Sequence, residues 1–388
     1  MSRSDGPARV LCVVGARPNF MKIAPIMRSL GARPAIFAPL LLHTGQHYDR
    51  SMKDAFFDQL GIPHPDVDLG VGSGSHAVQT AEVMRRFEPE LERLEPDAVL
   101  VVGDVNSTIA CSLVAVKRGV PVVHVEAGLR SFDRSMPEEI NRVLTDQIAD
   151  LLFTTEPDGA RNLQREGIDP ERIHFVGNVM IDTLLYNRER AERPAQVLAA
   201  LPHAGVFLDS PTGFGLVTLH RPSNVDDEQT LRGLLGALRE VAATVPLVFP
   251  VHPRTRARID AFGLMTIVET PRIALLEPLG YLQLLGLMAQ ARLVLTDSGG
   301  LQEETTALGV PCLTLRENTE RPVTVECGTN TVVGVEPARV LAAASDIFST
   351  GGKRGRVPEL WDGRAAERIA DIMQDWLVGR PPERQGSA

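Results

Sequence analysis

Short apolar runs rich in valine and leucine alternate along the chain with longer stretches whose apolar positions follow a helical spacing. The apolar runs predict strands, in chain order, at 8–15, 37–43, 97–104, 120–128, 151–156, 172–178, 214–220, 246–252, 293–300, 310–316 and 329–334. In the first half of the chain, the stretches between them predict helices near 20–30, 50–60, 75–94, 106–118, 137–149 and 157–166. Strands that are apolar throughout are typical of a parallel sheet covered by helices on both faces.

The alternation is interrupted at 187–212, where charged residues, proline and glycine mix without sustained periodicity, and we place a linker within this segment or just before it. The predicted fold class is therefore α/β, with two doubly wound Rossmann-like domains at 7–185 and 205–360 and a cleft between them. The last segment, 361–388, contains an amphipathic stretch at 362–377 that predicts a helix, which we expect to pack back toward the N-terminal domain.

Composition and charge argue against a nucleic-acid-binding protein and against a membrane protein. The 40 lysines and arginines against 49 aspartates and glutamates give a net charge of −9, and the cations form no run, so nucleic acid is not an expected partner. The chain has no apolar run of the ~20 residues that a membrane span needs. Its first residues lack an apolar signal-peptide core, so we expect a cytoplasmic protein with no membrane partner.

Metal chemistry is not expected either. The four cysteines form no CxxC pair, and Cys12, Cys111 and Cys312 lie in apolar segments where buried free thiols are the simplest interpretation. The nine histidines form no HExxH motif. A GxSxG nucleophile motif is also missing.

Two cations follow the first predicted strand. The turn after this strand carries Arg17, and Lys22 follows five residues later; neither a GxGxxG fingerprint nor a phosphate-binding P-loop is present. Such cations at the carboxyl end of a strand could bind a diphosphate. A tight turn followed by solvated helix charges explains the same residues equally well.

Three carboxylates follow later strands of the first domain. Asp104 closes one strand, where an ordinary helix-capping role competes with a catalytic one. Glu126 ends the next strand, where a carboxylate has no routine structural role. Glu138 opens a helix, where the helix dipole also favours an acid. All three are expected at one edge of the sheet, where neighbouring acids can divide the roles of proton donor and acceptor.

The helix at 137–149 has an amphipathic pattern that assigns its faces. The apolar positions predicted to form its buried stripe are Ile140, Val143, Leu144 and Ile148. The opposite face, which we expect to face the carboxylates, then carries Glu138, Asn141, Arg142 and Thr145.

The second domain shows a pattern suited to a phosphate group. His220 and Arg221 end one strand, and a later strand ends in Asp297 and opens a helix with Ser298, Gly299 and Gly300. Backbone N–H groups at such a glycine-rich helix start can approach a phosphate, and the helix dipole favours its charge. Glu304, one turn into that helix, could accept hydrogen bonds from ribose hydroxyls. An ordinary capped helix is the alternative.

Longer motifs spread over residues 10–330 resemble the UDP-N-acetylglucosamine 2-epimerase family. They are GARPNFMK, TGQHYD, VGDVNST, HVEAGLRSFDRSMPEEINR, TLHRPSNVDD, FPVHPRT and TDSGGLQEE followed by GVPCLTLRENTERP. The resemblance implies a glycosyltransferase-B-like fold, a UDP-sugar substrate, no cofactor and no metal, and a homodimer. It implies inversion at C2 through elimination of UDP to a 2-acetamidoglucal and its re-addition.

The resemblance also implies roles for individual residues. The catalytic residues are Asp104, Glu126 and Glu138 as acid/base groups and His220 for the departing UDP. The residues that bind substrate or UDP are Arg17, Lys22, Arg142, Arg221, His252, Ser298, Gly299, Gly300, Glu304 and Arg321. Some bacterial members bind a second substrate molecule through a Gln-His loop and a nearby arginine. Here Gln46 and His47 match that loop, whereas Ala81 stands where the arginine falls.

Other functions remain open at this level. A hydrolysing epimerase, which releases UDP and free N-acetylmannosamine, uses the same acid cluster, and relatives act on UDP-diacetamido-uronates. A glycosyltransferase of the same fold would use the phosphate-binding helix but does not need three carboxylates in one domain. A non-catalytic nucleotide-sugar sensor would not need the acids at all.

Overall fold

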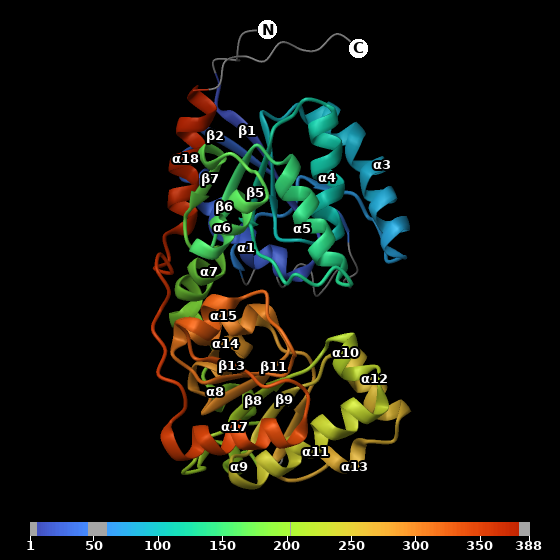
Figure 1. Cartoon of the computed structure of the whole chain (residues 1–388), viewed down its shortest axis with the longest axis vertical. Helices are drawn as coiled ribbons and strands as arrows, with labels where there is room; N and C mark the ends of the chain where they lie inside the picture. The colour runs from blue at the N-terminus through green and yellow to red at the C-terminus, as the bar shows by residue number, and fades with distance from the viewer. Residues whose placement is uncertain (1–5, 46–59, 202, 380–388) are drawn as a thin grey trace. The chain divides into compact units, whose positions relative to one another are not determined.

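The computed structural model describes residues 6–45, 60–201 and 203–379. Contacts divide the chain into two compact units, whose elements can be followed by colour in Figure 1. Unit 1 comprises Met1–Thr183 together with Glu359–Ala388, and unit 2 comprises Leu184–Pro358.

Unit 1 contains, within the described residues, a seven-stranded parallel sheet in the order β3-β2-β1-β4-β5-β6-β7. The strands are β1 (Ala8–Val14), β2 (Phe37–His43), β3 (Val67–Asp68), β4 (Ala98–Val102), β5 (Val122–Ala127), β6 (Leu151–Thr154) and β7 (Ile173–Phe175). The helices are α1 (Arg17–Gly31), α3 (His76–Leu94), α4 (Asn106–Lys117), α5 (Pro137–Ile148), α6 (Pro157–Arg165), η1 (Pro170–Arg172), α7 (Val179–Asn187) and α18 (Ala365–Gly379). Helices α3, α4 and α5 pack in succession, and α18 packs on α1 (Figure 1).

Unit 2 contains a six-stranded parallel sheet in the order β10-β9-β8-β11-β12-β13, counted over its described part. The strands are β8 (Gly215–Thr218), β9 (Leu247–Pro250), β10 (Ile273–Leu276), β11 (Leu293–Thr296), β12 (Cys312–Thr314) and β13 (Asn330–Val332). The helices are η2 (Arg188–Arg190), α8 (Pro194–Leu198), α9 (Gly205–Leu208), α10 (Pro222–Val225), α11 (Glu228–Thr244), α12 (Pro253–Ala261), α13 (Met265–Val268), α14 (Tyr281–Gln290), α15 (Gly299–Leu308), α16 (Pro322–Glu326) and α17 (Pro337–Thr350). Helix α11 packs on α17, and α14 packs on α8 and α15.

The predicted fold class, two doubly wound α/β units, is confirmed. Every residue of β4 and of β5 is buried, as expected for strands covered on both faces. The predicted strands and the predicted helices that fall in the described ranges are all present, with shorter strand ends. The helix predicted near 50–60 lies almost entirely outside the described residues.

Two strands were not predicted, β3 and β10. Both lie at sheet edges and pair with one neighbour. An edge strand needs less apolar surface than a central one, so its sequence carries a weaker signal. Strand β3 is only two residues long, and the last two residues of β10 are only partly buried.

The boundary between the units falls between Thr183 and Leu184, inside α7 and just before the segment at 187–212. That segment forms short helices of unit 2, in which Leu198 and Phe207 are buried. Among the described residues, no helix has both the length and the apolar character that a membrane span requires.

Each sheet has one point where the strand order reverses, and this point sets where a ligand can bind. In unit 1 it lies between β1 and β4, and in unit 2 it lies between β8 and β11. Connections leave such neighbouring strands in opposite directions, which opens a crevice outside their carboxyl ends. The residues that follow these strands are therefore the first candidates for a functional site.

Candidate functional site

Asp104 follows β4 at the reversal point of unit 1. Its carboxylate accepts a hydrogen bond from the Arg142 guanidinium at 2.5 Å, and its backbone carbonyl accepts one from the Asn141 amide at 3.0 Å. Both partners lie on α5. Asp104 is therefore not a simple helix cap; its side chain is held in an ion pair by the neighbouring helix.

Glu126 ends β5 in a strained backbone conformation. Its φ is +73°, in the left-handed region that a residue with a side chain rarely adopts, and the β5–β6 register shifts between Val125 and Ala127. The buried carboxylate forms an ion pair with the ammonium of Lys22 on α1. Backbone strain of this kind is found mainly at functional sites, because folding alone gains nothing from it.

Lys22 brings these two carboxylates into one neighbourhood. A Cβ built on Gly103, the residue before Asp104, would lie 2.8 Å from the Lys22 ammonium nitrogen. The ammonium thus lies against the end of β4 while it pairs with the acid at the end of β5. Lys22, predicted as a diphosphate ligand, has Glu126 as its partner in this structure.

The buried face of α5 is the opposite of the predicted one. Ile140 and Leu144 are 44% and 49% exposed, whereas the buried residues of this helix are Glu139, Arg142, Thr145 and Asp146. The prediction was wrong because the inner face of α5, which packs on α4 and β5, makes ion pairs with Asp104 and His124 instead of apolar contacts. Glu138 is half-buried one helical turn from Asn141 and Arg142, on the side of α5 that meets Asp104.

Glu139 was not identified from the sequence. Its buried carboxylate accepts hydrogen bonds from the Ser131 N–H and hydroxyl, both at 2.9 Å, and from the Phe132 N–H at 3.0 Å. It also pairs with Arg142 at 3.3 Å. It therefore anchors the loop before α5 and orients the arginine that contacts Asp104.

In unit 2, His220 follows β8 and is oriented by Asp297, which follows β11. The imidazole Nδ1 lies 2.8 Å from the Asp297 carboxylate, and the side chain of His220 is 42% exposed. Asp297 also accepts hydrogen bonds from the backbone N–H groups of His220 and Arg221 and from the Asn224 amide. Burial raises the pKa of Asp297, but His220 and these N–H groups outweigh it and hold the pKa below its usual range. Such a pair fixes the ring and directs Nε2 away from the carboxylate.

The glycine-rich start of α15 lies beside an ionic cluster. Ser298 precedes the helix, and Gly299 and Gly300 form its first turn. A Cβ on Gly299 would lie 2.8 Å from a carboxylate oxygen of Glu320. Glu320 pairs with Arg316 at 2.7 Å and with Arg221 at 3.5 Å. Burial alone would raise its pKa, but the surrounding arginines lower it well below the usual range.

Two further predicted ligands are buried in pairs. Glu304 accepts a hydrogen bond from the Tyr281 hydroxyl at 2.9 Å, and Arg321 lies 2.7 Å from Glu303. Burial, followed by the Glu304 carboxylate, raises the pKa of Tyr281 well above its ordinary value, so the phenol remains a donor. Tyr281 was not singled out in the sequence, because its partner Glu304 lies on a different helix.

His252 follows β9 and lies close to His220, with ring centroids 5.8 Å apart. Its Nδ1 accepts a hydrogen bond from the Arg254 N–H and caps α12. Arg17 begins α1, but its side chain is outside the described part of the chain, as are Gln46 and His47 entirely. Among the described residues, no group of three or more His, Cys, Asp or Glu could hold a metal ion.

The cysteines have no part in the site. Cys12, Cys111 and Cys312 are buried free thiols, as predicted. Burial, with a smaller contribution from Asp66, raises the pKa of Cys12 to about 12, which keeps the thiol protonated and unreactive.

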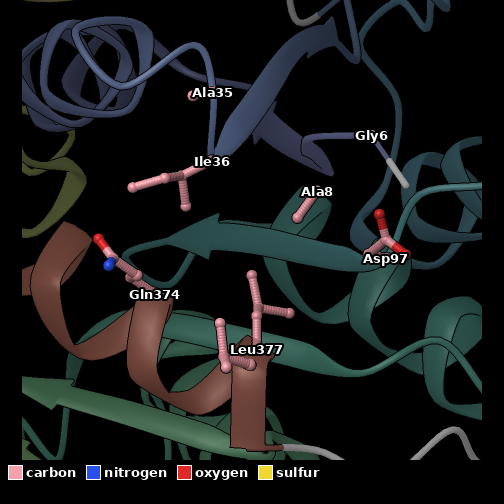
Figure 2. Close-up of a pocket in the computed structure, with 8 residues that line it drawn as sticks. Gly6, Ala8, Ala35, Ile36, Asp97, Gln374 and Leu377 are labelled. Atoms are coloured by element: carbon pink, nitrogen blue, oxygen red, sulfur yellow. The ribbon is translucent and has the colours of Figure 1, made fainter. Parts of the chain in front are cut away.

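A pocket of about 230 Å³ lies at the opposite edge of the unit 1 sheet. Figure 2 shows it between the amino ends of the strands, marked by Ala8, Ile36 and Asp97, and Gln374 and Leu377 of α18. Because ligands of open parallel sheets bind at the carboxyl ends of the strands, this pocket is not the candidate site.

The chain is similar to known proteins along most of its length. A family model described as UDP-N-acetylglucosamine 2-epimerase matches residues 30–374. The chain is 42% identical over 364 residues to the UDP-N-acetylglucosamine 2-epimerase of Methanococcus maripaludis, covering 93% of this chain and 97% of the relative. It is 40% identical over 369 residues to the UDP-2,3-diacetamido-2,3-dideoxy-D-glucuronate 2-epimerase of Pseudomonas aeruginosa, covering 94% and 99%.

A solved structure is similar along almost the whole chain. It is the crystal structure of Methanocaldococcus jannaschii UDP-GlcNAc 2-epimerase in complex with UDP-GlcNAc and UDP, with a TM-score of 0.83 and 39% sequence identity. The similarity covers 95% of this chain and 99% of that one.

Proposed function

Since this chain belongs to the UDP-N-acetylglucosamine 2-epimerase family, we propose that it interconverts UDP-N-acetylglucosamine and UDP-N-acetylmannosamine by inverting C2. The observation that carries the proposal is the placement of Asp104 and Glu126. Asp104 follows β4, which borders the reversal point of the unit 1 sheet, and Glu126 is the next-to-last residue of the neighbouring strand β5. Each of the two acids is paired with a cation.

The reaction needs a proton acceptor and a proton donor at one carbon. The C1–O bond to UDP breaks and its electron pair leaves with UDP. The electrons of the C2–H bond form the C1=C2 double bond of a 2-acetamidoglucal while a carboxylate takes the proton. Return of a proton to the other face of C2, with re-addition of UDP at C1, completes the inversion.

The three carboxylates have different surroundings. Asp104 is held by Arg142, and Glu126 is held by Lys22. Glu138 forms no ion pair with any residue in the described part of the chain. We assign the proton transfers at C2 to these three carboxylates.

Unit 2 supplies groups suited to the departing UDP. His220, held by Asp297, and Arg221 can stabilise the charge that develops on the leaving phosphate. The N–H groups of Gly299 and Gly300 can do the same, whereas the Ser298 N–H donates to the Thr296 hydroxyl at 3.0 Å and leaves the Ser298 hydroxyl as the ligand. Glu304, oriented by Tyr281, is assigned to the ribose hydroxyls. The remaining predicted ligands of the substrate are Arg17, Lys22, Arg142, His252 and Arg321.

The proposal extends to location and assembly. We expect a cytoplasmic homodimer, since UDP-sugars are cytoplasmic metabolites and the exposed Ile140 and Leu144 give α5 an apolar outer face. Light scattering at micromolar concentration tests the dimer, and a monomer at all concentrations would reject it.

The decisive test is incubation of the purified protein with UDP-N-acetylglucosamine in D2O, with a chelator present, followed by proton NMR. We expect loss of the C2 proton signal and growth of UDP-N-acetylmannosamine to a constant ratio. Asp104→Asn should abolish both changes. Accumulation of free N-acetylmannosamine and UDP would instead identify a hydrolysing enzyme, and an unchanged C2 proton would contradict elimination from this sugar.

A second substrate has specific support. The Pseudomonas aeruginosa relative named for UDP-2,3-diacetamido-2,3-dideoxy-D-glucuronate is nearly as similar as the archaeal one, 40% against 42% identical. The same elimination at C2 applies to that sugar. Measurement of kcat/KM for both substrates decides between them. A higher kcat/KM for the uronate would identify it, and not UDP-N-acetylglucosamine, as the preferred substrate.

A further inference from the structure

A buried ionic group lies behind the two carboxylates of unit 1. His124, in the middle of β5, is 0% exposed. Its Nδ1 lies 2.7 Å from the Asp146 carboxylate on α5, and its Nε2 lies 2.8 Å from the backbone carbonyl of Gly103. Asp146 also pairs with Arg130 at 2.7 Å.

The partners define the protons on the imidazole. Asp146 is ionised, because it faces the Arg130 guanidinium and also accepts the Gly128 N–H at 3.1 Å. Burial raises the pKa of Asp146, but His124 and Arg130 outweigh it and keep the pKa below its usual range. An ionised carboxylate and a carbonyl oxygen can only accept, so each contact is a hydrogen bond when the ring nitrogen that makes it carries hydrogen.

The buried ionic group contacts the backbone next to Asp104 and next to Glu126. Gly103, held by the imidazole, has a φ of +69° and directly precedes Asp104. Gly128, held by Asp146, has a φ of +79° and lies two residues after the strained Glu126. One carboxylate and one imidazole therefore hold the backbone at the ends of both β4 and β5.

Protein stability alone does not explain why this ionic group is buried in unit 1. Taking charges out of water is costly, and apolar residues of similar volume often replace a buried ion pair at no loss of stability. Directional hydrogen bonds, in contrast, can hold strained backbone in one conformation.

We propose that His124, Asp146 and Arg130 are positioning residues, which fix the carboxylates of Asp104 and Glu126 relative to each other for proton transfer at C2. The proposal rests on the epimerase function proposed above. An error of about 1 Å in such a site costs up to ~10²-fold in rate, so loss of the group should act on the chemical step.

The kinetic test uses an apolar double variant, His124→Phe with Asp146→Leu, which leaves Arg130 its second partner Glu166 at 2.6 Å. We expect kcat and the rate of C2 proton exchange to fall together by ~10–100-fold, with KM changed less than about threefold. The single variant His124→Gln, which keeps one donor for Gly103, should recover part of kcat. The matched control is His174→Gln, a half-buried histidine on β7 of the same sheet. Unchanged kcat in the folded double variant would overturn the proposal.

A second measurement does not need activity, and its main result comes from the wild-type protein. In wild-type protein labelled with ¹⁵N-histidine, the His124 resonances at neutral pH should show two N–H groups, and in Asp146→Asn they should show one. A wild-type His124 with one bare nitrogen would overturn the proposal. Wild-type protein that shows both N–H groups but does not epimerise would reject the proposed function and leave the ionic group itself intact.

Discussion

Glu138 and Glu139 are adjacent in the chain, yet their surroundings give them different roles. Glu139 is buried and its carboxylate is satisfied by Ser131, Phe132 and Arg142. Glu138 is half-buried and forms no ion pair with the described residues. Both suit the first turn of α5, so the helix dipole does not distinguish them.

The two glutamates give a matched pair of variants. Glu138→Gln should lower kcat by ~10²–10⁴-fold, because it removes a proton-transfer group, and should leave the melting temperature unchanged. Glu139→Gln should cost about 1–3 kcal/mol of stability, because it removes a charge that holds three hydrogen bonds. Initial rates and thermal melts of both variants check this. Equal kcat losses with equal melting temperatures would contradict the assignment.

Asp297 offers a test of how His220 is used. In Asp297→Asn the amide oxygen is kept by the N–H groups that bind Oδ2, so the amide NH2 faces the imidazole Nδ1 and the ring loses its fixed tautomer. We expect kcat to fall by ~10²-fold or more, as expected for the loss of general acid–base assistance. The control is Asp226→Asn, an aspartate that pairs with Arg254 and Arg258 rather than with His220, and this variant should retain kcat. Full activity of Asp297→Asn would mean that His220 does not act through this pair.

Among the elements, α5 is the helix whose buried face was wrongly predicted from its hydrophobic stripe, because the inner face of this helix is polar. The hydrophobic stripe of a helix identifies its buried side when the neighbour is an apolar sheet face. Helix α5 instead meets the strand ends, where Arg142 and Asp146 find ionic partners, and this leaves Ile140 and Leu144 exposed.

The start of α18 depends on a carboxylate from another helix. Asp182 on α7 accepts hydrogen bonds from the N–H groups of Ala365 and Ala366 at 3.1 and 2.7 Å. Burial nevertheless raises the pKa of Asp182 to about 6, although these hydrogen bonds lower it. An acid whose pKa is higher in the folded protein contributes most below its unfolded pKa, ~3.9, and this contribution is lost as the pH rises through about 6.

Asp182→Asn should therefore change the pH dependence of stability. The two helix N–H groups are bound by different carboxylate oxygens, so the single amide oxygen can accept from one of them, and the amide does not ionise. Relative to wild type, we expect the variant to gain on the order of 2–3 kcal/mol between pH 4 and pH 8. Amide exchange in α18, measured across that range, checks the change. If the difference in stability between the variant and wild type did not change with pH, Asp182 would not titrate between pH 4 and pH 8.

For the whole molecule, the chain path makes unit 1 discontinuous. Residues from Glu359 onward return to the unit that the first 183 residues form. Ile369 and Met373 of α18 are completely buried, and the Trp361 indole donates to the Thr155 carbonyl at 3.0 Å. Unit 1 therefore cannot complete its core until the C-terminal segment has been made.

Because α18 belongs to unit 1, a mutation of its buried residues should destabilise unit 1 and leave unit 2 unchanged. Ile369→Ala should destabilise unit 1 by about 2–5 kcal/mol through lost burial and a cavity. Both tryptophans of the chain, Trp361 and Trp376, lie in the returning segment, so their fluorescence reports this unit. Val378→Ala, at a 72% exposed position, should change stability by less than about 0.5 kcal/mol. Faster amide exchange in β8 and β11 of the Ile369 variant would contradict a localised effect.

The sequence by itself determined the α/β class, most strands and helices, and the family, which the comparisons confirm. It could do so because strand burial and the residues that end each strand are local properties, and because long motifs are specific. Only the tertiary structure decided the partners: Lys22 with Glu126, His220 with Asp297, and Asp146 with His124. Residues so far apart in the chain meet only because of the strand order and the helix packing. The local pattern of apolar and polar residues gives no information on either.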